Sequence, residues 1–249
     1  MKRRYSYLLP LAALLLLTIA YVAVTHAFRE PQDSGKAEPE APEYEYLSPH
    51  VTLSHYDGHF QEAADSIGLD WMLIAAIAYT ESRFDSTAVS NVGARGVMQM
   101  MPRTLDGLDV PDSLHTDNRH NIHASARYLK SLFNMFRSIK DHDERINFVL
   151  ASYNAGYGHI RDAMRLAKKY GHDSHKWEAS VDSFLIKKSQ PEFYNDSVCR
   201  NGEFNDWKQT LSFVKKVKRH WKRFYCMQQE YADSISIVMA NDTLKRIGQ

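Results

Sequence analysis

One nearly continuous apolar segment, residues 71–80, constrains the fold of this 249-residue chain more than any other feature. It reads Trp-Met-Leu-Ile-Ala-Ala-Ile-Ala-Tyr-Thr, and Asp70 directly before it is a favourable helix N-cap. A helix that is apolar around its whole circumference has to be enclosed by other elements. We therefore predict a core helix from Trp71 to Ser82, around which the remaining elements pack.

Other segments show the same helical spacing of apolar residues. Phe60, Ala63, Ala64 and Ile67 recur at positions i, i+3, i+4 and i+7, and Gly68 ends that run. Alternating β-branched residues are nearly absent, so we predict a mainly α domain. Residues 173–206 have poor periodicity and predict a long loop. The further helices that we predict cover residues 121–138, 146–153, 181–187 and 211–224.

The N-terminal residues predict export. Lys2, Arg3 and Arg4 precede an apolar run from Tyr5 to Phe28, which is long enough to span a bilayer. The run is either an uncleaved anchor or a signal peptide cut after Ala27, and both place the remaining chain outside the cytoplasm. The Pro-bearing acidic segment that follows cannot form a core. We predict residues 1–28 as signal anchor or signal peptide, 29–49 as a flexible tether and 50–240 as one domain.

Charge and cysteine content restrict the partners. The formal net charge of +1 gives no reason to expect a nucleic acid. Seven Lys or Arg residues and no acid lie between Lys208 and Arg223, which indicates either a solvated helix face or a patch for acidic groups. Cys199 and Cys226 are expected to form a disulfide in an exported protein, two free thiols being the alternative. No Cys or His residues have ligand spacing, so we expect no metal and no cofactor.

Glu81 is the candidate catalytic residue. It ends the apolar helix, where desolvation disfavours the charged carboxylate and raises its pKa, as a general acid requires. The alternative is a carboxylate that is exposed to water or paired with Arg83.

Two further clusters predict a groove that binds a sugar. Residues 90–102 contain Gly93 and Gly96, which permit positive φ, together with Gln99 and three methionines. Such a mixture offers apolar walls to sugar rings and amide groups to hydroxyls, although one or two of the methionines are expected to fill the core. Tyr153 and Asn154 stand at a helix end before Gly156, from which their polar groups can reach a cleft.

These clusters, in this order, resemble the motifs of the lytic transglycosylase catalytic domain, which has a goose-lysozyme-like fold. The matching region covers roughly Tyr56 to Ile160. Downstream segments resemble the C-terminal module of the membrane-bound lytic murein transglycosylase F group. The motifs that carry the resemblance are Glu81-Ser82, Ser90 through Pro102, Asn121-Ile122 with Tyr128-Leu129, Tyr153 through Gly156, residues 158–164 and residues 191–199.

The resemblance implies a lysozyme-like helical domain with a cleft, cutting the bond between N-acetylmuramic acid and N-acetylglucosamine and leaving 1,6-anhydro ends. Glu81 acts as acid and then as base, and Ser82 holds local structure. The implied partners are peptidoglycan glycan strands and, through the N-terminus, the membrane; the domain lies in the periplasm. The residues that it places along the substrate groove are Ser90, Gln99, Met101, Tyr153 and Asn154.

The sequence departs from the family pattern at one position of the cleft, and two alternative functions stay open. Gln209 stands where the family tends to have a glutamate that adds a second carboxylate to the cleft. A hydrolase of the same fold would need such a second acid to hold water, and Asp85 is a candidate. A non-catalytic module that binds the cell wall is the other alternative.

Overall fold

The computed structural model describes residues 51–247, with side chains described through residue 238. The predicted segments 1–28 and 29–49 lie outside this part. Residues 51–247 contain no β-strand, and only two isolated bridges join Arg95 to Val89 and to Met100. The expectation of a mainly α domain is confirmed. The helices are α2 (Asp57–Ile67), α3 (Trp71–Ser82), α4 (Pro102–Asp106), η1 (Asp112–Leu114), α5 (Asn118–Met135), α6 (His142–Ala155), α7 (Tyr157–Lys169), η2 (Trp177–Val181), α8 (Asp182–Lys187), α9 (Pro191–Tyr194) and α10 (Trp207–Ile247).

Helix α3 is the core helix that the sequence predicts. Its residues from Met72 to Ala78 are all buried, and α10 and α2 pack directly against it. Asp70 accepts a hydrogen bond from the backbone N–H of Met72 and so caps the first turn. The helix ends where Arg83 adopts a left-handed conformation with φ of 57°. Glu81 is therefore fixed in the last turn of the most deeply buried helix.

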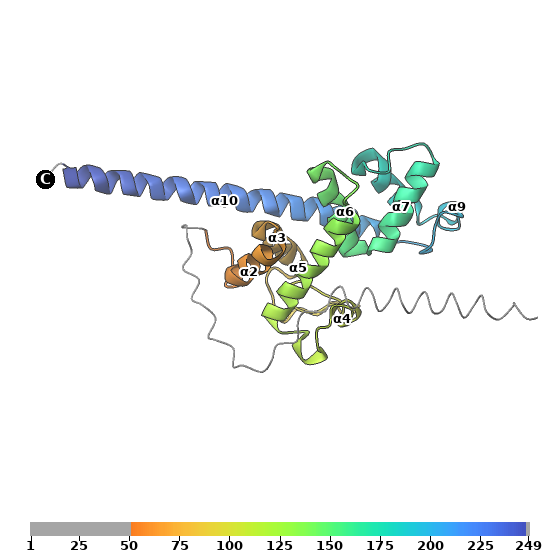
Figure 1. Cartoon of the computed structure of the whole chain (residues 1–249), viewed down its shortest axis with the longest axis horizontal. Coiled ribbons are helices and arrows are strands. Elements are labelled where there is room, and N and C mark those ends of the chain that lie inside the picture. Colours follow the sequence, from red (N-terminus) through yellow and green to blue (C-terminus); the bar gives the residue numbers. More distant parts are fainter. Residues whose placement is uncertain (1–50, 248–249) are drawn as a thin grey trace, which may run out of the picture. The chain divides into compact units, whose positions relative to one another are not determined.

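Asp70 also fastens α10 against α3. The indole N–H of Trp221 and the hydroxyl of Tyr225 both donate to Oδ2 of Asp70, each at 2.6 Å. Farther along the same contact, the ammonium of Lys218 donates to Oδ1 of Asn147 in α6 at 3.0 Å. Helix α10 thus passes beside both α3 and α6 (Figure 1) and brings its first turns to the end of α3.

The structure corrects the predicted bounds of several helices and adds one helix. Helix α5 begins at Asn118, three residues before the predicted start, because the side chain of Asp117 caps it by accepting from the N–H of His120. Helix α7 was not predicted at all. Its buried face nevertheless has helical spacing, at Ile160, Ala163, Met164 and Ala167, so the signal was present beyond the glycines that mark the end of α6.

Residues 173–206 are more ordered than a long loop, since η2, α8 and α9 lie within them. Asp162 of α7 anchors the segment through its buried carboxylate. The ammonium of Lys188, also fully buried, donates to it at 2.7 Å, and the backbone N–H groups of Arg200 and Asn201 donate at 3.0 and 2.8 Å. Burial raises the pKa of Asp162, but these hydrogen bonds outweigh it and lower the pKa to about 2.

The predicted disulfide is wrong, because Cys199 and Cys226 are both free thiols. The thiol of Cys199 donates to the backbone carbonyl of Phe193, whereas Cys226 is exposed on α10. Hydrogen bonds to Asp162 and Asp196 already hold the segment around Cys199.

Within residues 51–247, no helix is long and apolar enough to cross a membrane.

Candidate active site

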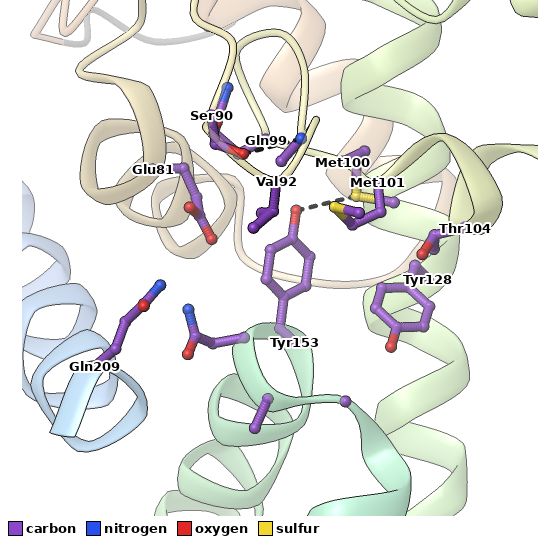
Figure 2. A pocket seen from close by; sticks show the side chains of 14 residues that line it. Glu81, Ser90, Val92, Gln99, Met100, Met101, Thr104, Tyr128, Tyr153 and Gln209 are labelled. Carbon is purple, nitrogen blue, oxygen red and sulfur yellow. Dashed lines mark hydrogen bonds between the residues drawn. The ribbon is translucent and has the colours of Figure 1, made fainter. Parts of the chain in front are cut away.

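A cavity of about 370 Å³ lies where the end of α3 meets α5, α6, the start of α10 and the loop between α3 and α4 (Figure 2). All six residues predicted for the site line it: Glu81, Ser90, Gln99, Met101, Tyr153 and Asn154. Their catalytic and binding roles stay predictions. The other lining residues are Val92, Ala94, Met100, Thr104, Tyr128, Ala155, Gly156 and Gln209.

Glu81 is the single carboxylate among these lining residues, and it points into the cavity (Figure 2). Burial raises its pKa to about 8. Among residues 51–238, its carboxyl has no hydrogen-bond or ion-pair partner that would favour the charged form, and Arg83 is exposed. The carboxyl is therefore protonated and uncharged at neutral pH, the state in which it can donate a proton.

The loop that forms one wall is held by hydrogen bonds of Ser82 and Asn121. The hydroxyl of Ser82 donates to the carbonyl of Val97 at 2.8 Å, which agrees with its predicted structural role. Oδ1 of Asn121 accepts from the N–H of Met98 at 3.0 Å, and its Nδ2 donates to two further carbonyls. Gly96 has φ of 75°, and a Cβ there would lie 3.0 Å from the side chain of Asn121. A glycine is therefore required at position 96.

Ser90 and Gln99 are both engaged within this loop. The hydroxyl of Ser90 accepts from the N–H of Ala94 at 2.9 Å. Nε2 of Gln99 donates to the carbonyls of Ala88 and Gly96 at 2.9 and 3.0 Å, which uses both of its hydrogens. Of the Gln99 amide, Oε1 alone therefore remains for a ligand.

The three methionines divide between core and cavity, as the sequence predicts. Met98 and Met100 are buried, whereas Met101 is 40% exposed and lines the cavity. Met101 therefore supplies the polarizable apolar surface on this wall.

Tyr153 stands at the centre of the site (Figure 2), where its hydroxyl meets both the loop and α5. It donates to the carbonyl of Met98 at 2.9 Å, so Oγ of Ser125, 2.8 Å away, donates to it. Burial, and next the charge of Glu81, raise the pKa of Tyr153 well above its usual value. The ring of Tyr128, 5.8 Å from that of Tyr153, adds an aromatic surface that the sequence argument did not assign to the site.

The remaining wall comes from α6 and α10. Oδ1 of Asn154 accepts from the hydroxyl of Thr210 at 2.9 Å, which leaves its amide N–H groups for the cavity. Gln209, the neighbour of Thr210, projects into the cavity opposite Glu81 (Figure 2). The residue flagged as a departure in the sequence is thus part of the site, and it adds a neutral amide where a carboxylate was expected from the resemblance.

Asp85, the candidate second acid, does not line the cavity. It is exposed, and hydrogen bonds from the hydroxyl and the N–H of Thr87 lower its pKa. It is therefore a charged surface carboxylate near Glu81 in sequence alone.

One group with metal-ligating side chains was not anticipated. Ligand atoms of Asp106, Asp112 and His115 lie within 4.8 Å of one another. Nε2 of His115 is already within hydrogen-bond distance, 2.9 Å, of the carbonyl of Val110, and both aspartates are largely exposed. These residues fit a structural turn after α4, and none of them lines the cavity.

The comparison with known proteins gives a family match for part of the chain. Residues 58–176 match the family model described as the Transglycosylase SLT domain. Two solved structures resemble the fold. The 70 kDa soluble lytic transglycosylase of Escherichia coli has a TM-score of 0.47 and 22% identity over 69% of this chain and 24% of its own. An inactive mutant of lytic transglycosylase Slt of Pseudomonas aeruginosa has a TM-score of 0.39 and 24% sequence identity. That match covers 62% of this chain and 27% of the Pseudomonas chain.

Several curated proteins that are similar to this chain share one name. Proteins named membrane-bound lytic murein transglycosylase F are similar to this chain in Desulfosudis oleivorans (40% identical over 172 residues) and Thiobacillus denitrificans (32% over 188). The match covers 69% and 75% of this chain. The chain spans little more than a third of these relatives, 37% and 38% of their lengths.

The buried carboxyl predicts a pH-dependent stability. Its pKa of about 8 lies above the ordinary value of 4.5, so the folded chain binds the proton more tightly. This contribution to stability is complete below about pH 4.5 and is lost as pH rises through about 8. Glu81→Gln should be close to wild type in stability at pH 5 and more stable at pH 8, by roughly 3 to 4 kcal/mol. Urea unfolding at both pH values measures this, and equal pH dependence in the two proteins would contradict the buried, neutral carboxyl.

Proposed function

We propose that this protein is a peptidoglycan lytic transglycosylase that cuts the β-1,4 bond between N-acetylmuramic acid and N-acetylglucosamine. The observation that carries the proposal is the lone, uncharged carboxyl of Glu81 in a cavity lined by amides, aromatic rings and a methionine. Those walls suit a sugar, whose ring faces are apolar and whose edges hydrogen-bond. The match of residues 58–176 to the transglycosylase family model and the names of the relatives support the same reaction. A lysozyme-like architecture with a cleft belongs to this proposal.

Protonated Glu81 donates its proton to the oxygen that links the two sugars, while the bond from that oxygen to C1 breaks. The carbonyl oxygen of the substrate's own acetamido group stabilises the positive charge on C1, so no second carboxylate is needed. The ionised Glu81 then removes the proton from the 6-hydroxyl of the same sugar, whose oxygen bonds to C1. The product is a 1,6-anhydro end, and Glu81 regains its starting state.

The composition of the cavity favours this route over the two rivals. An inverting hydrolase needs a second carboxylate to hold water, and neither Asp85 nor any other acid lines the cavity with Glu81. A non-catalytic wall-binding module gives no reason to keep an acid desolvated at the end of the core helix. Ser90, Gln99, Met101, Tyr153 and Asn154 contact the substrate strand in this proposal, with Tyr153 mainly holding the wall.

We propose further that the protein works at the cell envelope, with residues 50–240 as its catalytic domain on the periplasmic side. The basic start and apolar run of residues 1–28 and the membrane-bound names of the relatives support this. Fractionation should find the protein in the membrane, with its N-terminus intact. A soluble mature protein that begins at Phe28 would overturn the anchor and leave the proposed reaction standing.

Glu81→Gln should abolish lysis, because an amide can neither donate nor accept the proton. We expect a loss of about 10²- to 10⁴-fold in kcat with purified sacculi. Wild-type activity should fall as pH rises through about 8, where the acid form is lost. Mass spectrometry of the products should show 1,6-anhydro ends. Ordinary reducing ends would point to the hydrolase, and a variant within threefold of wild type would overturn the role of Glu81.

Gln209→Glu tests whether the missing second acid decides the product. The new carboxylate would lie opposite Glu81, where it could activate water and would raise the pKa of Glu81 by like-charge repulsion. We expect a measurable fraction of ordinary reducing ends, and activity that persists to higher pH. Gln209→Ala is the matched control and should produce anhydro ends alone. Identical product mixtures from both variants would show that Gln209 does not govern the outcome.

A further inference from the structure

The basic run of α10 contains one row that continues from the cavity. Gln209, Lys216 and Arg223 stand seven residues apart, and on an α-helix seven residues bring a side chain back to within about 20° of the same direction. Because Gln209 lines the cavity, the row leads out from it along about 21 Å of helix. Lys216 and Arg223 are both exposed.

Two more cations border this row. Arg83, exposed just after the helix that carries Glu81, and Arg219 of α10 lie close enough to act on His220. Burial first, and then the charges of Arg219, Arg223, Arg83 and Lys216, lower the pKa of His220. His220 itself packs edge-on against Tyr79 of α3, with ring centroids 4.8 Å apart. Together with Lys216 and Arg223, these two arginines form a group of four cations. We call these four residues (Arg83, Lys216, Arg219 and Arg223) the basic row.

Nothing in the described part of the chain neutralises the basic row. Residues 51–238 contain several ion pairs, but none of them involves these four side chains. No acidic residue occurs between Lys208 and Arg223, so the run cannot form the usual i, i+4 pairs within the helix. Four like charges are therefore left without acidic partners along the part of α10 that leads away from an otherwise nearly neutral cavity, which favours an anionic partner.

We propose that the basic row binds carboxylate groups carried as side groups on the same glycan strand whose backbone occupies the cavity. The inference rests on the proposed function. Peptide stems of peptidoglycan carry such carboxylates, and they branch from the strand at regular intervals. A strand that leaves the cavity along α10 would present its next stems to Lys216 and then to Arg219 and Arg223.

A lipid surface is the competing partner, and the surface chemistry disfavours it. A helix that binds a membrane interface needs exposed apolar side chains to insert beside its cations. Between Trp207 and Phe224, none of the large apolar side chains is exposed, and those that are exposed on α10 (Tyr225, Tyr231, Ile237 and Val238) lie beyond the row. The row also begins at the cavity that holds the strand in the proposed function.

The helix provides a matched control. Lys215 and Lys222 are exposed and are seven residues apart like Lys216 and Arg223. They lie about 100° farther around α10 than that pair, on the other side of Arg219. The double variants K216Q/R223Q and K215Q/K222Q therefore remove the same charge from the same helix. Each should be assayed on glycan strands that bear peptide stems and on the same strands after an amidase has removed the stems.

On strands with stems, K216Q/R223Q should raise KM about three- to tenfold and leave kcat unchanged, since exposed ion pairs contribute little each and act on binding. Added salt should raise the KM of wild type and of K215Q/K222Q more than that of K216Q/R223Q. On strands without stems the three proteins should behave alike. Urea unfolding confirms that both variants are folded.

Equal effects of the two double variants, or a defect of K216Q/R223Q that persists on stem-free strands, would overturn the inference. So would wild-type kinetics of K216Q/R223Q on strands with stems, accompanied by lost binding to vesicles of anionic phospholipid. The proposed function fails separately: in that case wild type releases no new ends from either kind of strand.

Discussion

Asn121 hydrogen-bonds three backbone groups: two of the partly buried loop between α3 and α4, which has no regular secondary structure, and the carbonyl of His115. A buried loop of this kind has no ladder partners, so each hidden N–H and carbonyl needs a side-chain partner or costs free energy. Asn121 serves Met98 and two carbonyls, and the hydroxyls of Ser82 and Tyr153 serve Val97 and Met98. The wall of the cavity is thus held by helices α3, α5 and α6 together. Because the same loop presents Ser90, Gln99 and Met101, the geometry of the site depends on these few buried polar contacts.

The sequence was most informative where one residue type has a single physical purpose. The apolar run after Asp70, with Glu81 at its end, correctly predicts the buried helix and the acid that it carries into the cavity. The positive φ at Gly96 was likewise foreseeable, because only glycine both adopts it and allows Asn121 to approach. In such cases burial or sterics leaves few alternatives, so local pattern and tertiary structure agree.

Features that depend on distant contacts could not be predicted in this way. A disulfide between Cys199 and Cys226 was predicted because the chain is expected to be exported and has two cysteines. In the structure both are free thiols, and Asp162 and Asp196 already anchor the segment that a disulfide would tie down. The direction of the Gln99 amide depends on two carbonyls of its own loop, and Tyr128 joins the site through the path of α5. The position of Gln209 opposite Glu81 follows from how Asp70 holds α10. In each case a side chain has several possible partners, and the spacing of residues in the sequence does not show which one it contacts.

The two carboxamides from the loop and α6 give the cavity a polarity. Gln99 spends both amide hydrogens on its own loop and shows an oxygen, whereas the oxygen of Asn154 is occupied by Thr210 and its nitrogen is shown instead. A substrate amide bound between them would place its N–H toward Gln99 and its carbonyl toward Asn154. Turned end for end, the same group would set oxygen against oxygen and hydrogen against hydrogen. A substrate that carries acetamido groups would therefore be bound preferentially in the first of these two orientations.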